Sequence, residues 1–215
     1  MKKLKKVALA LVCVMMIGVL GGCGSKFDAQ AYLNALLDAS YKNDSTAFVN
    51  MKIGTAEEAA ELYEQGIDSE MNAFLAQFEV SEELEAEFRQ LFKDMLGKVK
   101  YTVEGAEKQE DGSYVVTVSY EQMLIFEKIK VDFDTAIVDL STELMESEEA
   151  LSEEETMERM IVALKDCMQS NLENVEYAEP ATEKVRIELI DGVYTPNQDD
   201  VANLESVLFD TDAAN

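Results

Sequence analysis

The class of fold is decided within residues 81–120, SEELEAEFRQLFKDMLGKVKYTVEGAEKQEDGSYVVTVSY. The first half of this stretch repeats apolar residues at intervals of three and four, which is the period of an amphipathic helix. These residues are Leu84, Phe88, Leu91, Phe92 and Met95. Ser81 can cap the first turn and Gly97 can end the last one. The spacing therefore predicts a helix from about residue 82 to residue 97.

The second half of the same stretch changes to a period of two. Apolar residues alternate with polar ones on both sides of Asp111-Gly112, a sequence typical of a tight hairpin turn. The alternating residues are Val99, Tyr101 and Val103 before the turn and Tyr114, Val116, Val118 and Tyr120 after it. This pattern predicts an antiparallel β-hairpin directly after the helix.

Further helices are predicted on the amino-terminal side of this stretch. Asp28 can cap a first helix with an apolar face among alanines, and that helix is expected to end near Asn43. Thr55 and Glu58 have the spacing of a capping box, which predicts a second long helix.

On the carboxyl-terminal side, Ser152 and Glu155 form a second candidate capping box before another helix. A strand through Val185, Ile187 and Leu189 then precedes an Asp191-Gly192 turn, a short return strand and a last amphipathic helix. The last helix is indicated by Val201, Leu204 and Leu208, which follow one another at helical spacing.

Residues 122–134 fit either a strand or a helix, because apolar residues occur there at both periods. The longer register favours one helix near residues 124–146. Two apolar rows follow it, and we expect such a helix to be the central and most buried one. The rows are Phe126, Ile129, Phe133, Ile137, Leu140 and Leu144, and Leu124, Val131, Val138 and Met145.

The elements together predict an α+β fold, because helices precede and interrupt two antiparallel hairpins without strand–helix–strand alternation. We expect the hairpins to form a curved sheet packed against several amphipathic helices. With 47% hydrophobic residues, the chain can bury a substantial core.

The first residues have the order of an export signal. Four lysines, at positions 2, 3, 5 and 6, precede an uncharged apolar stretch that is too short for a permanent membrane span of about 20 residues. The stretch ends in Leu20-Gly21-Gly22-Cys23, which resembles the lipobox of bacterial lipoproteins. The resemblance implies cleavage between Gly22 and Cys23 and attachment of lipid to the Cys23 thiol.

This interpretation divides the chain into a signal peptide at residues 1–22, a lipidated tether at residues 23–27 and a single extracytoplasmic domain at residues 28–215. It places the protein on the outer face of the cell membrane, held only by the lipid on Cys23, whose acyl chains are of the palmitate type. Cys167 is then the only thiol of the mature domain without lipid, so an intramolecular disulfide is excluded. We expect Cys167 to act as a small packing residue that resists modification.

The charge of the chain is strongly negative and excludes some partners. Loss of the leader leaves 14 basic residues against 44 acidic ones, a net charge of −30. Nucleic acid needs clustered Lys and Arg, so it is not expected as a partner.

Several kinds of catalytic and metal site are absent from the sequence. The chain contains no histidine, which removes Ser-His-Asp and Cys-His systems and histidine-ligated metals. No glycine-rich phosphate loop and no calcium-loop motif occurs. No cofactor or metal is therefore expected, and carboxylate pairs remain the one catalytic option, since glycoside hydrolysis needs only two acids.

The arrangement of lipobox, alanine-rich helix, hairpin, long helix pair and strand-turn-strand ending resembles a group of Gram-positive surface lipoproteins. Some members of that group are described as cystatin-like or similar to the nuclear transport factor fold. The resemblance implies no catalytic residue.

Two classes of function follow. The first, which we favour, is a non-catalytic binding or scaffold module for a small molecule, peptide or envelope protein, with a curved sheet lined by Tyr101, Tyr114 or Tyr120. The second is a small surface hydrolase that uses carboxylates. Two close carboxylates in a deep pocket would favour the second class.

Overall fold

The structure is a computed structural model of the full chain, and it describes residues 19–20, 27–76, 78, 80–146 and 151–209. The fold is α+β, as predicted. The helices are α1 (Ala29–Lys42), α2 (Thr46–Asn50), α3 (Ala56–Leu75), α4 (Glu82–Gly97), α5 (Phe126–Glu146), α6 (Glu153–Glu173) and α7 (Gln198–Leu208). The strands are β1 (Val19–Leu20), β2 (Lys100–Lys108), β3 (Tyr114–Glu121), β4 (Met123–Leu124), β5 (Glu176–Tyr177), β6 (Ala181–Ile190) and β7 (Val193–Pro196).

The helix boundaries follow the capping residues identified in the sequence. Asp28, Thr55, Ser81 and Ser152 each accept a hydrogen bond from a backbone N–H of the first turn, and both predicted capping boxes are complete. Asn43 ends α1 in the left-handed conformation, at φ 52°. Local side-chain chemistry therefore decides where these helices begin and end.

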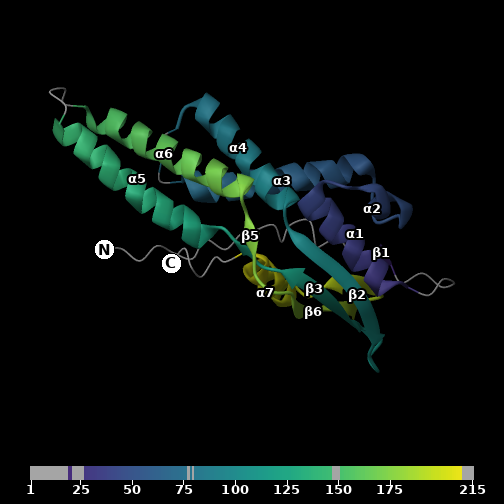
Figure 1. The fold of residues 1–215 in the computed structure, drawn as a ribbon. Helices are drawn as coiled ribbons and strands as arrows, with labels where there is room; N and C mark the ends of the chain where they lie inside the picture. The colour runs from purple at the N-terminus through teal and green to yellow at the C-terminus, as the bar shows by residue number, and fades with distance from the viewer. Residues whose placement is uncertain (1–18, 21–26, 77, 79, 147–150, 210–215) are drawn as a thin grey trace.

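The main sheet is antiparallel, in the order β1-β7-β6-β3-β2 (Figure 1). Both predicted hairpins are present, and each turn contains a glycine with positive φ, Gly112 and Gly192. The two hairpins join through β3 and β6, where Val116 lies opposite Val185. A second, two-stranded sheet pairs β4 with β5.

The true central helix is α1. Nine of its residues are buried, three of them alanines. Two polar side chains at its edges bond to β2: the Gln30 amide donates to the Val103 carbonyl at 2.8 Å, and Asp38 accepts from the Tyr101 hydroxyl at 2.7 Å. The buried Tyr41 hydroxyl has no hydrogen-bond partner among the described residues.

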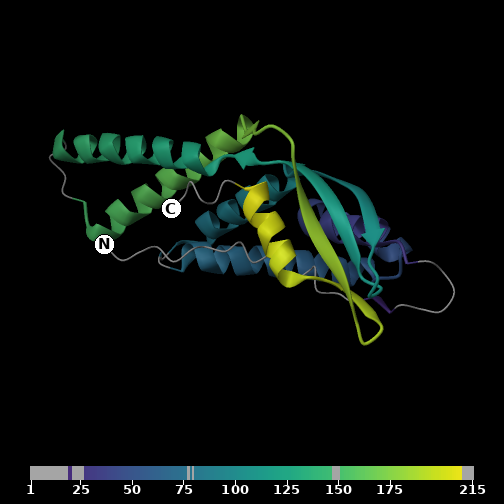
Figure 2. The ribbon, with the colours of Figure 1, turned by 90° about the horizontal axis from the view of Figure 1, so that it is seen from below.

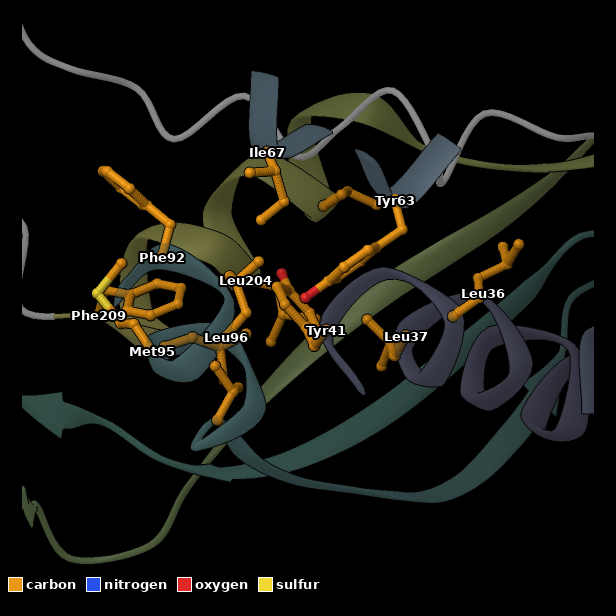
Figure 3. Close-up of a cluster of buried hydrophobic side chains, with 14 of the residues drawn as sticks. Leu36, Leu37, Tyr41, Tyr63, Ile67, Phe92, Met95, Leu96, Leu204 and Phe209 are labelled. Atoms are coloured by element: carbon orange, nitrogen blue, oxygen red, sulfur yellow. The ribbon is translucent and has the colours of Figure 1, made fainter. Parts of the chain in front are cut away.

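Helices α3, α4 and α7 complete the core around α1. Figure 3 shows side chains from all four helices meeting in one cluster, which continues into Phe209 just after α7. The labelled members are Leu36, Leu37, Tyr41, Tyr63, Ile67, Phe92, Met95, Leu96, Leu204 and Phe209.

The prediction that residues 124–146 form the most buried helix is wrong. The helix exists from Phe126 onward, but Leu124 belongs to β4, and Ile129 is the only buried residue of α5. Helix α5 packs chiefly against α6, and the two project from the body of the molecule as an antiparallel pair (Figures 1 and 2). Residues 122–134 are thus a short strand followed by helix.

We call the projecting pair of helices α5 and α6 the arm. We expect the core and the arm to respond differently when a side chain is truncated to alanine. Leu37→Ala opens a cavity beside fully buried neighbours and should lower the free energy of unfolding by about 2–5 kcal/mol. Val138→Ala removes methyl groups that face solvent and should change it by no more than about 0.5 kcal/mol. Urea unfolding of the two variants measures the difference. Equal losses would show that α5 is part of the cooperative core.

Candidate functional site

The sheet tyrosines do not line an open cavity. Tyr101, Tyr114 and Tyr120 lie on the same side of the sheet as the buried Val116 and Val118, as the alternation and the register predict. That side is covered by α1. Burial and the hydrogen bond to Asp38 raise the pKa of Tyr101 well above its ordinary range, so its hydroxyl is a structural donor. The binding surface expected in the sheet concavity is filled by core packing.

Tyr114 belongs to an aromatic cluster that holds the start of the domain. Phe27 stacks on Tyr194 with ring centroids 3.8 Å apart, and it also contacts Tyr114 at 5.6 Å and Tyr32 at 5.3 Å. The Tyr32 hydroxyl donates to the Tyr194 carbonyl at 3.2 Å. Such contacts stabilise by packing and ring geometry together, so Phe27, the last residue of the predicted tether, is packed against the β6–β7 hairpin.

The core encloses two glutamates that the sequence did not single out. Glu70 on α3 and Glu205 on α7 are both buried. Burial, followed by the nearby carboxylates of Glu205 and Glu70, raises the pKa of the buried Tyr41 on α1. The signal was present in the spacing, because Glu70 follows Ile67 by three residues and Glu205 follows Val201 by four on apolar helix faces.

Neither of these carboxylates lines either of two surface hollows among the described residues. One hollow, of about 510 Å³, lies between α4 and α6 beside Leu91 and Leu172. The other, of about 530 Å³, lies beside Asp28, Asn34 and Met51. Glu70 and Glu205 are instead enclosed by the core, which gives a substrate no evident way to reach them and weakens the interpretation as a carboxylate hydrolase.

The most unusual surface lies on the outer face of α5. Five residues, which we call the α5 stripe, are exposed there: Val131, Thr135, Val138, Thr142 and Met145. Val131 is 59% exposed, Val138 64% and Met145 87%. The three large apolar residues of the stripe lie on one side of the helix with threonines between them, and exposed apolar residues that share one surface mark an interaction site more often than scattered ones do.

The opposite face of α5 explains why the stripe is left outside. Half-buried residues of that face pack on α6, and the stripe lies about half a turn away from them around the helix axis. These residues are Phe133, Ala136, Ile137, Leu140 and Leu144. Asn171 of α6 also donates to the Asp132 carboxylate at 2.7 Å. Helix α5 therefore has two apolar faces, and the described part of the chain covers one of them.

The stripe is bordered by acids. From residue 131 to residue 146 every charged residue of α5 is acidic: Asp132, Asp134, Asp139, Glu143 and Glu146. The two lysines of α5, Lys128 and Lys130, come before this segment, and Lys128 forms an ion pair with Glu176 at 2.5 Å. An apolar seam with acidic borders is thus the main chemical feature of the arm.

The remaining features are the predicted lipid site, candidate metal sites and candidate membrane-spanning helices. Gly22 and Cys23 lie outside the described residues. Within the described ranges, no group of three or more Cys, Asp or Glu side chains is placed to hold a metal ion. No helix among the described residues is both long enough and apolar enough to cross a membrane.

Cys167 lies on α6, packed at the edge of the core and half-buried rather than enclosed. Burial and the carboxylates of Asp132 and Asp166 raise the pKa of its thiol. Because the thiolate is the reactive form, these groups suppress reaction near neutral pH.

We predict that iodoacetamide labels native Cys167 more slowly than free cysteine at pH 7.5, with a rate that rises as the pH approaches the raised pKa. Asp132→Asn removes one of the charges that disfavour the thiolate, so it should increase the rate at pH 8. Mass spectrometry of the labelled peptide measures both. A rate equal to that of free cysteine at pH 7.5 would contradict the assigned environment.

Comparison with known proteins identifies a shared fold. No family model and no curated protein matches the sequence. Among solved structures, the chain resembles the ycdA protein of Bacillus subtilis, which is named as a lipoprotein, with a TM-score of 0.55 and 15% sequence identity. The match covers 85% of this chain and 56% of that one, so this chain spans just over half the length of its neighbour. At this identity the likeness shows that the two proteins have the same fold.

Proposed function

We propose that the protein is a lipid-anchored extracytoplasmic module that binds another protein through the α5–α6 arm and performs no catalysis. The observation that carries this proposal is the position of the α5 stripe. It lies on a helical pair that projects from the end of the molecule opposite the start of α1 (Figures 1 and 2).

The anchor is supported by the leader and by the lipobox at Leu20-Gly21-Gly22-Cys23. The fold shared with a protein named as a lipoprotein agrees with it. A diacylglyceryl cysteine supplies two acyl chains, and each buried CH₂ contributes about 0.8 kcal/mol, so this modification alone is sufficient for stable anchoring. We propose a likeness to cystatin or nuclear transport factor domains only for the way in which the sheet packs on its helix.

The geometry of the anchor would orient the domain. Cys23 and Phe27 are four residues apart, a distance of at most about 14 Å in any conformation. Phe27 is fixed in the aromatic cluster with Tyr32, Tyr114 and Tyr194. A lipid on Cys23 would therefore hold this end of the domain against the membrane and direct the arm away from it.

Removal of residues 1–22 would also change the sheet. β1, which pairs with β7 at Val19↔Tyr194 and Leu20↔Val193, belongs to the predicted signal peptide. Cleavage would leave β7 as the edge strand, and its Pro196 is a residue that edge strands tolerate. The hydrolase alternative keeps one observation in its favour, the buried pair Glu70 and Glu205, but it lacks an accessible pocket at that pair.

The anchor is tested by Cys23→Ser. The wild type should incorporate a labelled fatty acid and partition into the detergent phase, because lipid on Cys23 is its sole proposed anchor. The variant should incorporate no label and should remain uncut or be released. Metabolic labelling followed by phase partitioning measures both properties. Wild-type protein without label in the aqueous phase would refute the anchor.

The binding role of the arm is tested in intact cells. A photo-crosslinking amino acid at position 138 should form a discrete adduct with a protein, because this residue lies at the centre of the α5 stripe. The same amino acid at Val162, an exposed residue of α6 outside the stripe, provides the matched control. Immunoblotting and mass spectrometry compare the two. Equal patterns at both positions would refute the arm as a binding site.

A further inference from the structure

We infer that the α5 stripe binds an amphipathic helix whose apolar seam is bordered by Lys or Arg. This inference rests on the proposed binding role of the arm and adds the chemistry of the partner. It depends on three features of α5: the spacing of the stripe, the satisfaction of its polar atoms and the sign of the charges beside it.

The spacing matches a helix–helix seam. The stripe residues follow one another at intervals of four, three, four and three, from Val131 to Met145. This is the repeat by which one helix packs along another in a coiled coil, and it continues for about four turns, or roughly 21 Å. A small-molecule site would need a concave surface, whereas this row lies along the convex side of a helix.

The two threonines of the stripe do not oppose apolar contact. The Thr135 hydroxyl donates to the Val131 carbonyl at 3.0 Å, and the Thr142 hydroxyl donates to the Val138 carbonyl at 2.9 Å. Both hydroxyl hydrogens therefore keep a partner when water is removed. Their methyl groups can then join Val131, Val138 and Met145 in an apolar seam.

The charges beside the seam select the partner. Asp132, Asp139 and Glu146 follow the apolar residues on one side, and Asp134 lies on the other side. In a coiled coil these flanking residues face the flanking residues of the partner helix. A second copy of α5 would place acid against acid in either orientation, which disfavours pairing.

A partner helix with Lys or Arg at its flanking positions would instead be attracted by the flanking acids of α5. The mature net charge of −30 would also steer a basic partner toward the protein and repel acidic ones. Anionic lipid is disfavoured for the same reason. Electrostatics therefore favours a basic helix over both a second copy and a membrane.

The test uses the full lipidated protein in nanodiscs of neutral phosphatidylcholine, with empty nanodiscs as the background. The probes are two fluorescent 21-residue helical peptides with the same leucine seam, one with Lys and the other with Glu at the flanking positions. Anisotropy should show at least about tenfold tighter binding of the Lys peptide. The difference should shrink as salt is raised, because exposed charges are screened.

Variants assign the binding to the α5 stripe. Val138→Asp should weaken binding of the Lys peptide at least about tenfold, since it places a charge in the centre of the seam. Val162→Asp introduces the same change on α6 outside the stripe and should leave binding unchanged. The double variant Asp134→Lys and Asp139→Lys should reverse the preference so that the Glu peptide binds more tightly. Circular dichroism confirms that each variant is folded.

Three results would overturn the inference. These are equal binding of the two peptides, failure of both to bind, and loss of binding in Val162→Asp as large as in Val138→Asp. Self-association of the wild type that Val138→Asp abolishes would assign the stripe to a second copy instead. A discrete adduct at position 138 in cells, together with any of these results, would leave the binding role standing and refute only the basic helix.

Discussion

The burial of α1 against the sheet is the constraint on which the rest of the structure depends. Helix α1 places nine buried residues, three of them alanines, between the sheet and three other helices. Gln30 and Asp38, at the edges of α1, bond to the Val103 carbonyl and the Tyr101 hydroxyl of β2. Because α1 begins directly after the tether, the same packing also fixes the end of the domain that carries Phe27.

The position of the α5–α6 arm follows from this arrangement. Helices α1, α3, α4 and α7 fill one side of the sheet, so α5 and α6 have no place in the main core and pack on each other. Helix α6 is held to the body through α4, where Lys165 pairs with Glu87 at 3.1 Å. Helix α5 is a further layer outward, which explains why one of its apolar faces remains exposed. The feature that we propose for function is therefore a consequence of how the core is completed.

The core contains a cluster of buried polar side chains. Glu70, Glu205 and Tyr41 come from three different helices and meet where those helices converge. Burying carboxyl groups is costly unless they are protonated or bonded, so the packing around this cluster must offset that cost. In an open pocket the same three groups would indicate acid–base catalysis. Here the three groups are enclosed by the core.

The sequence by itself determined the local structure of this protein. Asp28, Thr55, Ser81 and Ser152 set helix starts, and Asp111-Gly112 and Asp191-Gly192 set the hairpin turns, because each of these signals acts within a few residues. The sequence also contains the α5 stripe as the row Val131, Val138 and Met145, and its periodicity predicts a buried face where the structure has an exposed one. Hydrophobic periodicity shows that a helix has an apolar face, and it does not show whether another element covers that face. Only the tertiary structure decided that α1 is central, that α5 is peripheral and that Glu70 and Glu205 are enclosed. Those outcomes depend on which helices pack on one side of a single sheet. That packing is decided by contacts between residues far apart in the chain, which local sequence patterns do not describe.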